Sequence, residues 1–253
     1  MMKRVDCLEA LARHVTDADI VLPVYSAAFD WIDIRPHPLN YLSHGAMGLA
    51  SSHALGLALG RPDRRVIVLD GDGSLLMNLG SLVTIGAAAP PNLYHFVCEN
   101  GTYEANGGHP IPGRDKVDFA GFARAAGYRV VFDFSDLDIF ERQVGALLAE
   151  TGPVFADLKI SPGAPQGRDY TRLHGPHVRK AFPGRADGEL TWEMAEGPTC
   201  DLTGSSWPPR SAWRCSDADG SNRPTRKPRI IPAGRSLSSS VSLPAAASTP
   251  MPG

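Results

Sequence analysis

The first 160 residues or so alternate strand-like and helix-like segments, and this alternation constrains the fold more than any other feature. RVIVLD, residues 65–70, is a continuous apolar run of strand length, typical of a strand buried on both faces. Residues 48–59 are small and apolar on most faces, which predicts a helix buried against a sheet. Strands joined by helices need crossover connections, so we expect an α/β fold: a parallel sheet with helices on both faces. Further strands are predicted at 19–24, 93–98, 128–132 and 154–160, and further helices at 5–15, 75–88, 118–127 and 137–150.

The sequence changes in kind near Pro183. Residues 183–253 hold ten of the 22 prolines and three of the four tryptophans, with long Ser- and Arg-rich runs and no period that could bury a face. We therefore predict one folded domain over residues 1–182, followed by a disordered C-terminal tail. The tail is either a linker or interaction segment or, as we favour, GC-rich coding sequence read out of frame.

Composition excludes several classes of protein. With 43% hydrophobic and 21% charged residues, the chain resembles an ordinary globular protein. A net charge of -2 gives no reason to expect nucleic acid or an anionic membrane as partner. No run of eighteen apolar residues predicts a membrane span, and the N-terminus MMKRVDCLEALARHV lacks the apolar core of a signal peptide, so we expect a cytoplasmic protein. No pair of cysteines has C-x-x-C spacing, which disfavours zinc, iron–sulfur and dithiol chemistry.

Gly71-Asp72-Gly73-Ser74 follows the predicted strand at 65–70 directly. Ligands of open parallel sheets lie beyond the carboxyl ends of the strands. Two glycines let backbone N–H groups approach an anion closely, and Ser74 can cap the next helix while donating its hydroxyl. Asp72 offers a hard oxygen suited to magnesium, which binds through few protein ligands plus phosphate oxygens. Together they are the residue types of a metal-assisted phosphate site, but Asp-Gly after a strand is also common in ordinary turns, so this element alone does not decide between the two.

Asn100-Gly101-Thr102 ends the next apolar strand, twenty-eight residues after Asp72. Two strand ends separated by one helix are near neighbours in a parallel sheet. Asn100 can supply a side-chain oxygen and Thr102 a main-chain carbonyl. With Asp72, two diphosphate oxygens and a water, they would complete an octahedral magnesium shell.

The order G-D-G, helix, strand, N resembles the thiamine-diphosphate motif of the decarboxylase-type family. In that family the Asp, the Asn and the carbonyl two residues later hold the metal, which implies Asp72, Asn100 and Thr102 here. Many members have Asn-Asn where this chain has Glu99-Asn100, and the ligand is the second residue. GDGSLLMNLGSLVTIG and NGTYEANGG look most like sulfopyruvate decarboxylase beta subunits and phosphonopyruvate decarboxylases, over about residues 5–160. The implied cofactors are thiamine diphosphate and Mg²⁺.

A third segment, Ser43-His44-Gly45-Ala46-Met47-Gly48, is similar to the family's Gly-x-Met-Gly element. The resemblance implies that the Gly45 carbonyl accepts a hydrogen bond from the aminopyrimidine and that Met47 wedges the cofactor into its bent shape. His44 and His109 are the catalytic candidates, as groups able to reach the substrate or donate a proton. Glu104 either flanks the diphosphate loop or faces solvent. The cofactor-binding candidates are Gly45, Ala46, Met47, Gly71, Asp72, Gly73, Ser74, Asn100, Thr102, Tyr103 and Glu104.

The family also needs an acidic residue against the pyrimidine ring, which resides in a separate pyrimidine-binding domain. The chain leaves no ordered length for that domain, so we expect a partner subunit of the alpha type. The resemblance implies a beta-type subunit of a decarboxylase acting on a small 2-oxo acid with an anionic tail. Arg114 and Lys116 are the nearest basic residues for such a tail.

Three alternatives remain. A dinucleotide-binding dehydrogenase would need G-x-G-x-x-G, and GDGSLL lacks the third glycine and has an acid in the loop. The chain could instead be a subunit of another thiamine-diphosphate carboligase or oxidoreductase. It could also be a truncated, non-catalytic copy.

Overall fold

Strand β2 (Val66–Gly71) is the apolar run at RVIVLD, and it lies between β1 (Ile20–Pro23) and β3 (Leu93–Glu99). The computed structural model describes residues 1–42, 47–163 and 173, which belong to one compact unit, Met1–Glu193. Within the described residues five parallel strands form one sheet in the order β1-β2-β3-β7-β6. The remaining strands of the sheet are β6 (Val130–Phe134) and β7 (Val154–Lys159). The predicted parallel sheet is confirmed.

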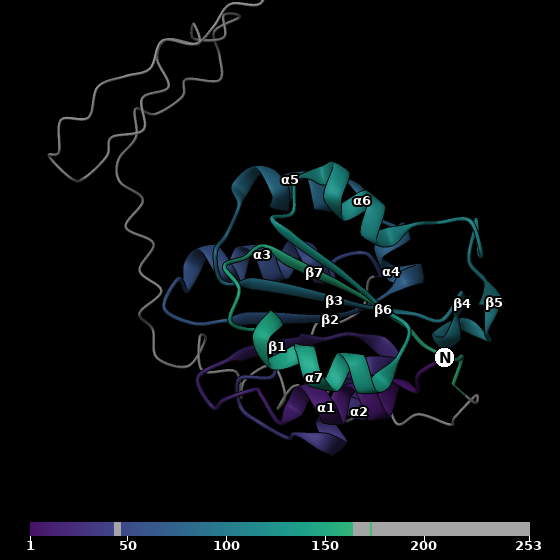
Figure 1. Cartoon of the computed structure of the whole chain (residues 1–253), viewed down its shortest axis with the longest axis horizontal. Helices are drawn as coiled ribbons and strands as arrows, with labels where there is room; N and C mark the ends of the chain where they lie inside the picture. The colour runs from purple at the N-terminus through teal and green to yellow at the C-terminus, as the bar shows by residue number, and fades with distance from the viewer. Residues whose placement is uncertain (43–46, 164–172, 174–253) are drawn as a thin grey trace, which may run out of the picture. The chain divides into compact units, whose positions relative to one another are not determined.

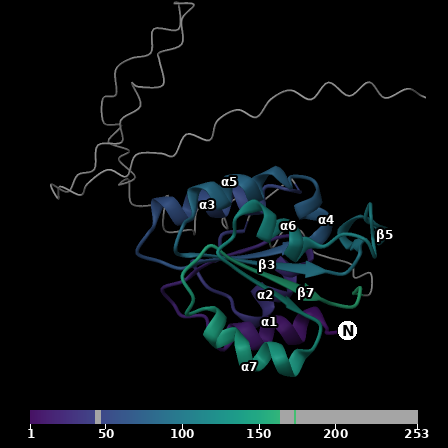
Figure 2. The same ribbon diagram turned by 45° about the horizontal axis from the view of Figure 1, so that its top comes forward.

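Helices cover both faces of the sheet, as predicted, and two views show the same division (Figures 1 and 2). One face carries α1 (Arg4–Ala12), α2 (Tyr25–Ile34) and α7 (Leu137–Leu147). The other carries α3 (Ala50–Gly60), α4 (Asp72–Leu76), α5 (Gly80–Ala88) and α6 (Phe119–Ala126). After β3 the chain forms a small hairpin of β4 (Thr102–Tyr103) and β5 (His109–Pro110) around the short helix η1 (Glu104–Asn106).

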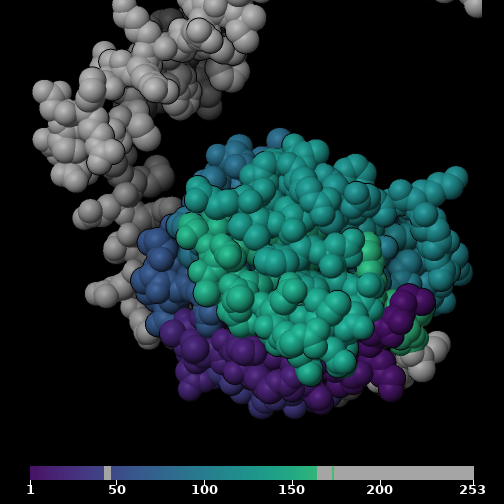
Figure 3. All heavy atoms as spheres, viewed as in Figure 1, coloured from purple at the N-terminus to yellow at the C-terminus, as the bar shows by residue number. Residues whose placement is uncertain are grey.

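Two hydrophobic cores lie on the two faces of the sheet, and β2 contributes to both. Ile67 and Leu69 pack in the core with α1 and α7, whereas Val66 and Val68 pack in the core with α3 and α5. Alternate residues of a strand point to opposite faces, so a strand covered on both sides must be apolar throughout. The space-filling view shows α7 and α1 packed side by side over the first core (Figure 3).

The structure adds one helix, corrects another and refines a third. Helix α2 was not predicted, although it ends at Ile34, just before Pro36. The single helix expected at 75–88 is two helices, α4 and α5, so a helix begins directly at Asp72. Helix α3 is not buried all round: Ala50, Ala54 and Ala58 are buried, but Leu59 is 59% exposed. The small residues of α3 therefore mark the one face of the helix that packs against the sheet.

Two predicted features lie outside the described residues. They are residues 43–46, which include His44, Gly45 and Ala46, and the Pro/Ser/Arg-rich segment 183–253. In the part of the chain that the structure describes, no helix has the length and apolarity needed to cross a bilayer.

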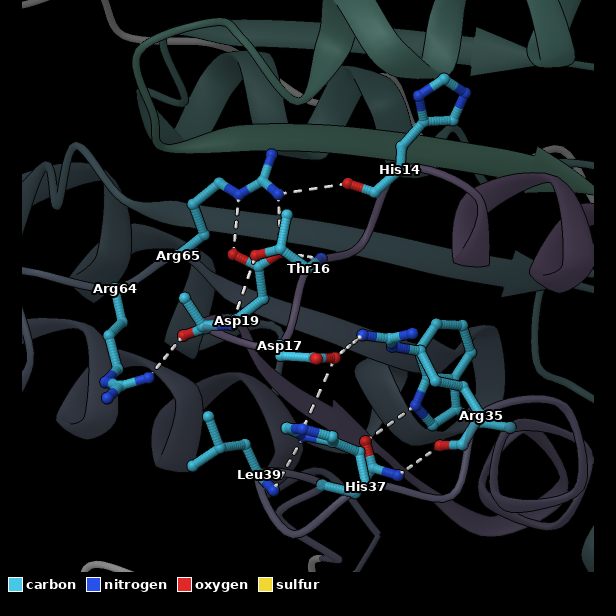
Figure 4. Close-up of polar contacts among 12 residues, drawn as sticks. His14, Thr16, Asp17, Asp19, Arg35, His37, Leu39, Arg64 and Arg65 are labelled. Carbon is cyan, nitrogen blue, oxygen red and sulfur yellow. Dashed lines mark hydrogen bonds and ion pairs between the residues drawn. The ribbon is translucent and has the colours of Figure 1, made fainter.

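Asp19 and Arg65 form a partly buried ion pair at the amino ends of β1 and β2, with Asp19 buried and the Arg65 side chain 28% exposed (Figure 4). Both carboxylate oxygens of Asp19 accept hydrogen bonds from the Arg65 guanidinium, at 2.8 and 2.6 Å, and Thr16 donates its N–H as well. Arg65 also donates to the carbonyls of His14 and Leu148, which lie beyond the ends of α1 and α7. Burial alone would raise the pKa of Asp19, but the bonds from Arg65 and Thr16 outweigh it and hold the pKa below its usual value.

We expect Asp19→Asn to lower the free energy of unfolding at pH 7 by about 1–3 kcal/mol, because it leaves the half-buried Arg65 without its charged partner. The folded-state pKa of Asp19 is depressed, so this difference should be full above pH ~4 and shrink as the pH falls through the folded pKa. Urea unfolding of the full chain at pH 7, 5 and 3 measures it.

Asp17→Asn is the matched control, since Asp17 is 85% exposed and its pair with Arg35 should contribute less than about 1 kcal/mol. Equal losses in the two variants, or a loss that does not depend on pH, would contradict the assignment.

Candidate functional site

The carboxyl ends of β2 and β3 lie next to each other, with Gly71 paired to Cys98, and the Asp72 carboxylate joins the two loops that follow. Asp72 Oδ2 accepts hydrogen bonds from the backbone N–H groups of Asn100, at 3.0 Å, and Gly101, at 2.6 Å. Asp72 Oδ1 accepts from Gly73 N–H at 2.7 Å. The structure thus brings together the two motifs that stand twenty-eight residues apart in the sequence.

The side chain of Asn100 is held in a fixed orientation. Its Oδ1 accepts from the N–H of Thr102 at 2.8 Å and from the Thr102 hydroxyl at 3.0 Å. Its Nδ2 donates to Glu104 Oε2 at 2.9 Å. Asp72, Asn100 and Thr102 are each at most 9% exposed. A cation at Asn100 Oδ1 would replace the bond from the Thr102 hydroxyl, which is free to rotate.

These donors fit a magnesium ion. Across the described ranges, no group of three or more His, Cys, Asp or Glu side chains is arranged to hold a metal, so any cation here would rely on one carboxylate and neutral oxygens. Magnesium is bound in this way where phosphate oxygens complete its shell. Burial raises the pKa of Asp72 to about 6, with the Glu99 charge adding to it and the three backbone N–H bonds opposing it. A bound cation would favour the charged carboxylate that burial disfavours.

A pocket with about 450 Å³ of empty space, part of it open to solvent, lies beside Asp72. Its walls come from α1, the start of α2, the ends of β2 and β3, both motif loops and Met47. The lining residues are Arg4, Val24, Tyr25, Ser26, Ala27, Met47, Asp70, Gly71, Asp72, Gly73, Ser74, Cys98, Asn100, Thr102, Tyr103, Glu104 and Ala105. All of the cofactor-binding candidates that fall within the described residues line this pocket.

Ser74 connects the glycine-rich loop to the segment that ends at Gly48. Its hydroxyl accepts a hydrogen bond from Gly48 N–H at 3.1 Å, and Asn78 donates to the Gly48 carbonyl at 2.9 Å. Gly48 has φ +85°, and a Cβ there would lie 3.1 Å from Met77 and Asn78. The expected helix cap by Ser74 is wrong: α4 begins at Asp72, so Ser74 lies inside the helix, and the residue before α4 is Gly71, which has no side chain to cap it.

Of the two catalytic candidates, the structure describes only His109, and it does not lie at the pocket. His109 lies on β5, is exposed, and is not among the lining residues; His44 lies outside the described residues. Arg114 and Lys116 are also exposed and do not line the pocket. Glu104, by contrast, has a side chain only 8% exposed, so it flanks the loop and does not face solvent.

Two parts of the pocket were not predicted from the sequence. Arg4, in the first turn of α1, has a side chain only 10% exposed, and a single Arg in a short amphipathic helix gives no sign of burial. The start of α2 contributes Tyr25, whose φ of +47° is unusual for a non-glycine residue, and Ser26. The Ser26 hydroxyl is buried and, among the described residues, meets no hydrogen-bond partner.

The fold and this site define an α/β protein with a pocket beside a buried, hydrogen-bonded carboxylate at the carboxyl edge of a parallel sheet, where sheets of this kind bind ligands. Residues 22–158 match the family described as thiamine pyrophosphate enzyme, C-terminal TPP binding domain. The chain therefore belongs to the thiamine pyrophosphate enzyme family, and the matched residues form its TPP-binding domain.

Named relatives agree with this family. The chain is 38% identical over 163 residues to sulfopyruvate decarboxylase subunit beta of Methanothermobacter thermautotrophicus, covering 64% of this chain and 84% of that protein. It is 36% identical over 180 residues to phosphonopyruvate decarboxylase of Streptomyces viridochromogenes, covering 71% of this chain but only 45% of that protein. Benzoylformate decarboxylase from Polynucleobacter necessarius has the same fold, with a TM-score of 0.53 at 20% identity over 63% of this chain and 33% of that chain.

Gly73 must be glycine because the ring of Tyr103 packs directly against it. A Cβ on Gly73 would lie 2.5 Å from Tyr103 Cδ1, whereas a Cβ on Gly71 would meet nothing within 4 Å. We expect Gly73→Ala to lower the free energy of unfolding by about 1–3 kcal/mol through overpacking. Gly71→Ala is the control and should lower it much less. Chemical denaturation of both variants measures this, and equal effects would contradict the packing role of Tyr103.

Proposed function

We propose that this chain is the beta-type subunit of a thiamine-diphosphate- and Mg²⁺-dependent decarboxylase that acts on a small anionic 2-oxo acid, sulfopyruvate- or phosphonopyruvate-like. The observation that carries the proposal is the buried Asp72 carboxylate, bonded to the backbone of Asn100 and Gly101 at the edge of the pocket. The names of the two relatives supply the substrate class. Family membership supplies the cofactor.

In this proposal Asp72, the Asn100 side chain and the Thr102 carbonyl hold Mg²⁺. Backbone N–H groups of the glycine-rich loop bind the diphosphate, next to Tyr103 and Glu104. Gly45 accepts from the aminopyrimidine, and Ala46 and Met47 support the bent cofactor. When bound, thiamine diphosphate supplies the carbon nucleophile and the electron sink for loss of carbon dioxide.

The apolar side chains that line the pocket also have a role in this proposal. Val24 and Ala27 are buried and line the pocket with Met47. Side chains of this kind exclude water from the reacting groups and strengthen the electrostatic interactions within the site. His44 and His109 remain candidates for proton transfer, with the exposed His109 requiring a contact beyond the pocket described above.

A partner subunit follows from the state of the acids in the pocket. Of the described lining residues, three carry a carboxylate, and each is engaged. Asp70 accepts from Gly71 N–H and lies 3.4 Å from the His95 ring; Asp72 binds the motif loop; Glu104 pairs with Arg4. We infer that the acid facing the pyrimidine ring comes from a pyrimidine-binding, alpha-type subunit.

We also propose that residues 1–182 form the functional domain, that residues 183–253 add nothing to it, and that the protein acts in the cytoplasm. All three proposals rest on the sequence alone. A carboligase or oxidoreductase of the same family is the second candidate, and product analysis separates it from a decarboxylase, which releases an aldehyde with carbon dioxide.

Asp72→Asn tests the metal site. We expect it to weaken Mg²⁺-dependent thiamine diphosphate binding by at least about 100-fold, because the charged ligand is lost while most backbone contacts remain. Calorimetric titration in the presence of the partner subunit measures the affinity. Asp17→Asn, a change of the same chemistry at the opposite end of the sheet, should leave it unchanged; an unchanged affinity in Asp72→Asn would refute the assignment.

Division of labour between two subunits is testable by reconstitution. The purified chain should release no carbon dioxide from sulfopyruvate or phosphonopyruvate at a useful rate, because its described pocket acids are all committed. Addition of the pyrimidine-binding subunit should restore turnover. Carbon dioxide release from a panel of 2-oxo acids measures both arms, and robust turnover by the chain alone would show that the acid is supplied within it.

A further inference from the structure

We propose that Arg4 and Glu104 are positioning residues that fix the Asn100 amide with its oxygen toward the metal. This inference rests on the proposed function, in which Asn100 Oδ1 is a ligand of Mg²⁺. It concerns two side chains that lie outside the metal shell itself and act only through Asn100.

Three charged side chains form a continuous chain of bonds that ends on Asn100. Arg4 donates to Glu104 through two nitrogens, Nη1 to Oε2 at 2.7 Å and Nη2 to Oε1 at 3.1 Å. Arg4 Nε donates to Asp30 Oδ2 at 2.6 Å. Glu104 Oε2 then accepts from Asn100 Nδ2 at 2.9 Å. The side chains of Arg4, Asp30 and Glu104 are 10%, 18% and 8% exposed, so the contacts are shielded from water.

The orientation of the Asn100 amide decides whether the site can hold a cation. The oxygen and the NH₂ of an amide have nearly the same size, so packing alone does not distinguish the two orientations. A charged carboxylate accepts hydrogen bonds but cannot donate them. Glu104 therefore selects the orientation in which Nδ2 faces it and Oδ1 faces Thr102. In the reverse orientation Asn100 would present two N–H donors to the metal.

Arg4 holds the Glu104 carboxylate in the position that faces Asn100. The two-pronged contact from Arg4 engages both oxygens and fixes the plane of the carboxylate. Gly163 closes the opposite side, since a Cβ there would lie 2.9 Å from Glu104 Oε1. Asp30 of α2 holds the remaining nitrogen of Arg4, so helices α1 and α2 both support the metal loop.

A purely structural tether of α1 would show the same contacts, and the metal affinity of a folded variant separates the two roles. In Glu104→Gln, the oxygen of the introduced amide is drawn to the donors of Arg4, and its NH₂ turns toward Asn100. Asn100 Nδ2 then faces a donor in place of its acceptor, so only the Thr102 N–H still favours the orientation with the oxygen toward the metal. In the double variant Arg4→Met/Glu104→Gln the competing donors are gone, so the oxygen of the introduced amide can accept from Asn100 Nδ2 again. Adding Arg4→Met should therefore restore part of the metal affinity that Glu104→Gln removes.

The experiment measures Mn²⁺ binding by electron paramagnetic resonance, with the full chain, thiamine diphosphate and the pyrimidine-binding subunit. We expect Glu104→Gln to weaken Mn²⁺ binding by about 10–100-fold. The double variant should bind about 10-fold more tightly than Glu104→Gln. Arg13→Met is the matched control: Arg13 directly follows α1 and pairs with Glu141, but the pair is largely exposed and does not line the pocket, so affinity should match wild type. Circular dichroism checks that each variant is folded.

The outcomes distinguish this inference from the function it rests on. If wild type binds no Mn²⁺, or Asp72→Asn binds it as tightly as wild type, the proposed metal site is wrong. If wild type and Asp72→Asn behave as expected but Glu104→Gln binds Mn²⁺ as tightly as wild type, the positioning role is wrong. If the double variant is no tighter than Glu104→Gln, the contacts are structural only. Rescue by the second substitution supports the proposal.

Discussion

The acceptance of three backbone N–H bonds by the Asp72 carboxylate is the interaction on which the rest of the site depends. Asn100 and Gly101 follow a different strand from Asp72, and their N–H groups have few other ways to be satisfied at a buried turn. One side chain therefore closes the gap between two strand ends and positions the loop that carries the other candidate ligands. The same carboxylate remains able to bind a cation, because three bonds leave part of its accepting capacity unused.

The acidic side chains around the pocket are balanced by donors that lie close to them. The pocket brings carboxylates of Asp70, Asp72 and Glu104 close to a site proposed for a diphosphate, and each needs a donor or a cation nearby. Backbone N–H groups serve Asp70 and Asp72, and Arg4 serves Glu104. Beyond the pocket, Lys159 pairs with Glu99 and Asp157 at the same edge of the sheet, and burial raises the pKa of Asp157. The carboxyl edge is thus rich in acids that are neutralised locally.

The sequence predicted the sheet, most of its helices and the two motif loops because these depend on local pattern. A run such as RVIVLD has no stable place except between two helical layers, and glycine with Asp directly after it marks where that strand ends. It could not predict Arg4, Ser26 or the burial of Glu104. Arg4 is joined to Glu104 across 100 residues, and only the packing of α1 and α2 against the loop brings them together. The break between α4 and α5 was also missed, since Asn78, just beyond the first helix, bonds to Gly48, a tertiary contact.

The two ends of the sheet have separate tasks, and this separation makes the site open to experiment. At the amino ends, Asp19 and Arg65 tie β2 to the segments after α1 and α7 through bonds that engage both side chains fully. At the carboxyl ends, Asp72 is held by backbone N–H groups, and Asn100 by Thr102 and Glu104. Neither side chain is needed to hold the hydrophobic cores together. A loss of stability at the amino ends therefore need not alter binding at the proposed site at the carboxyl ends. Arg4 is the exception among the described charges, because α1 packs on the core with its apolar side while the Arg4 guanidinium reaches Glu104 in the loop after β3.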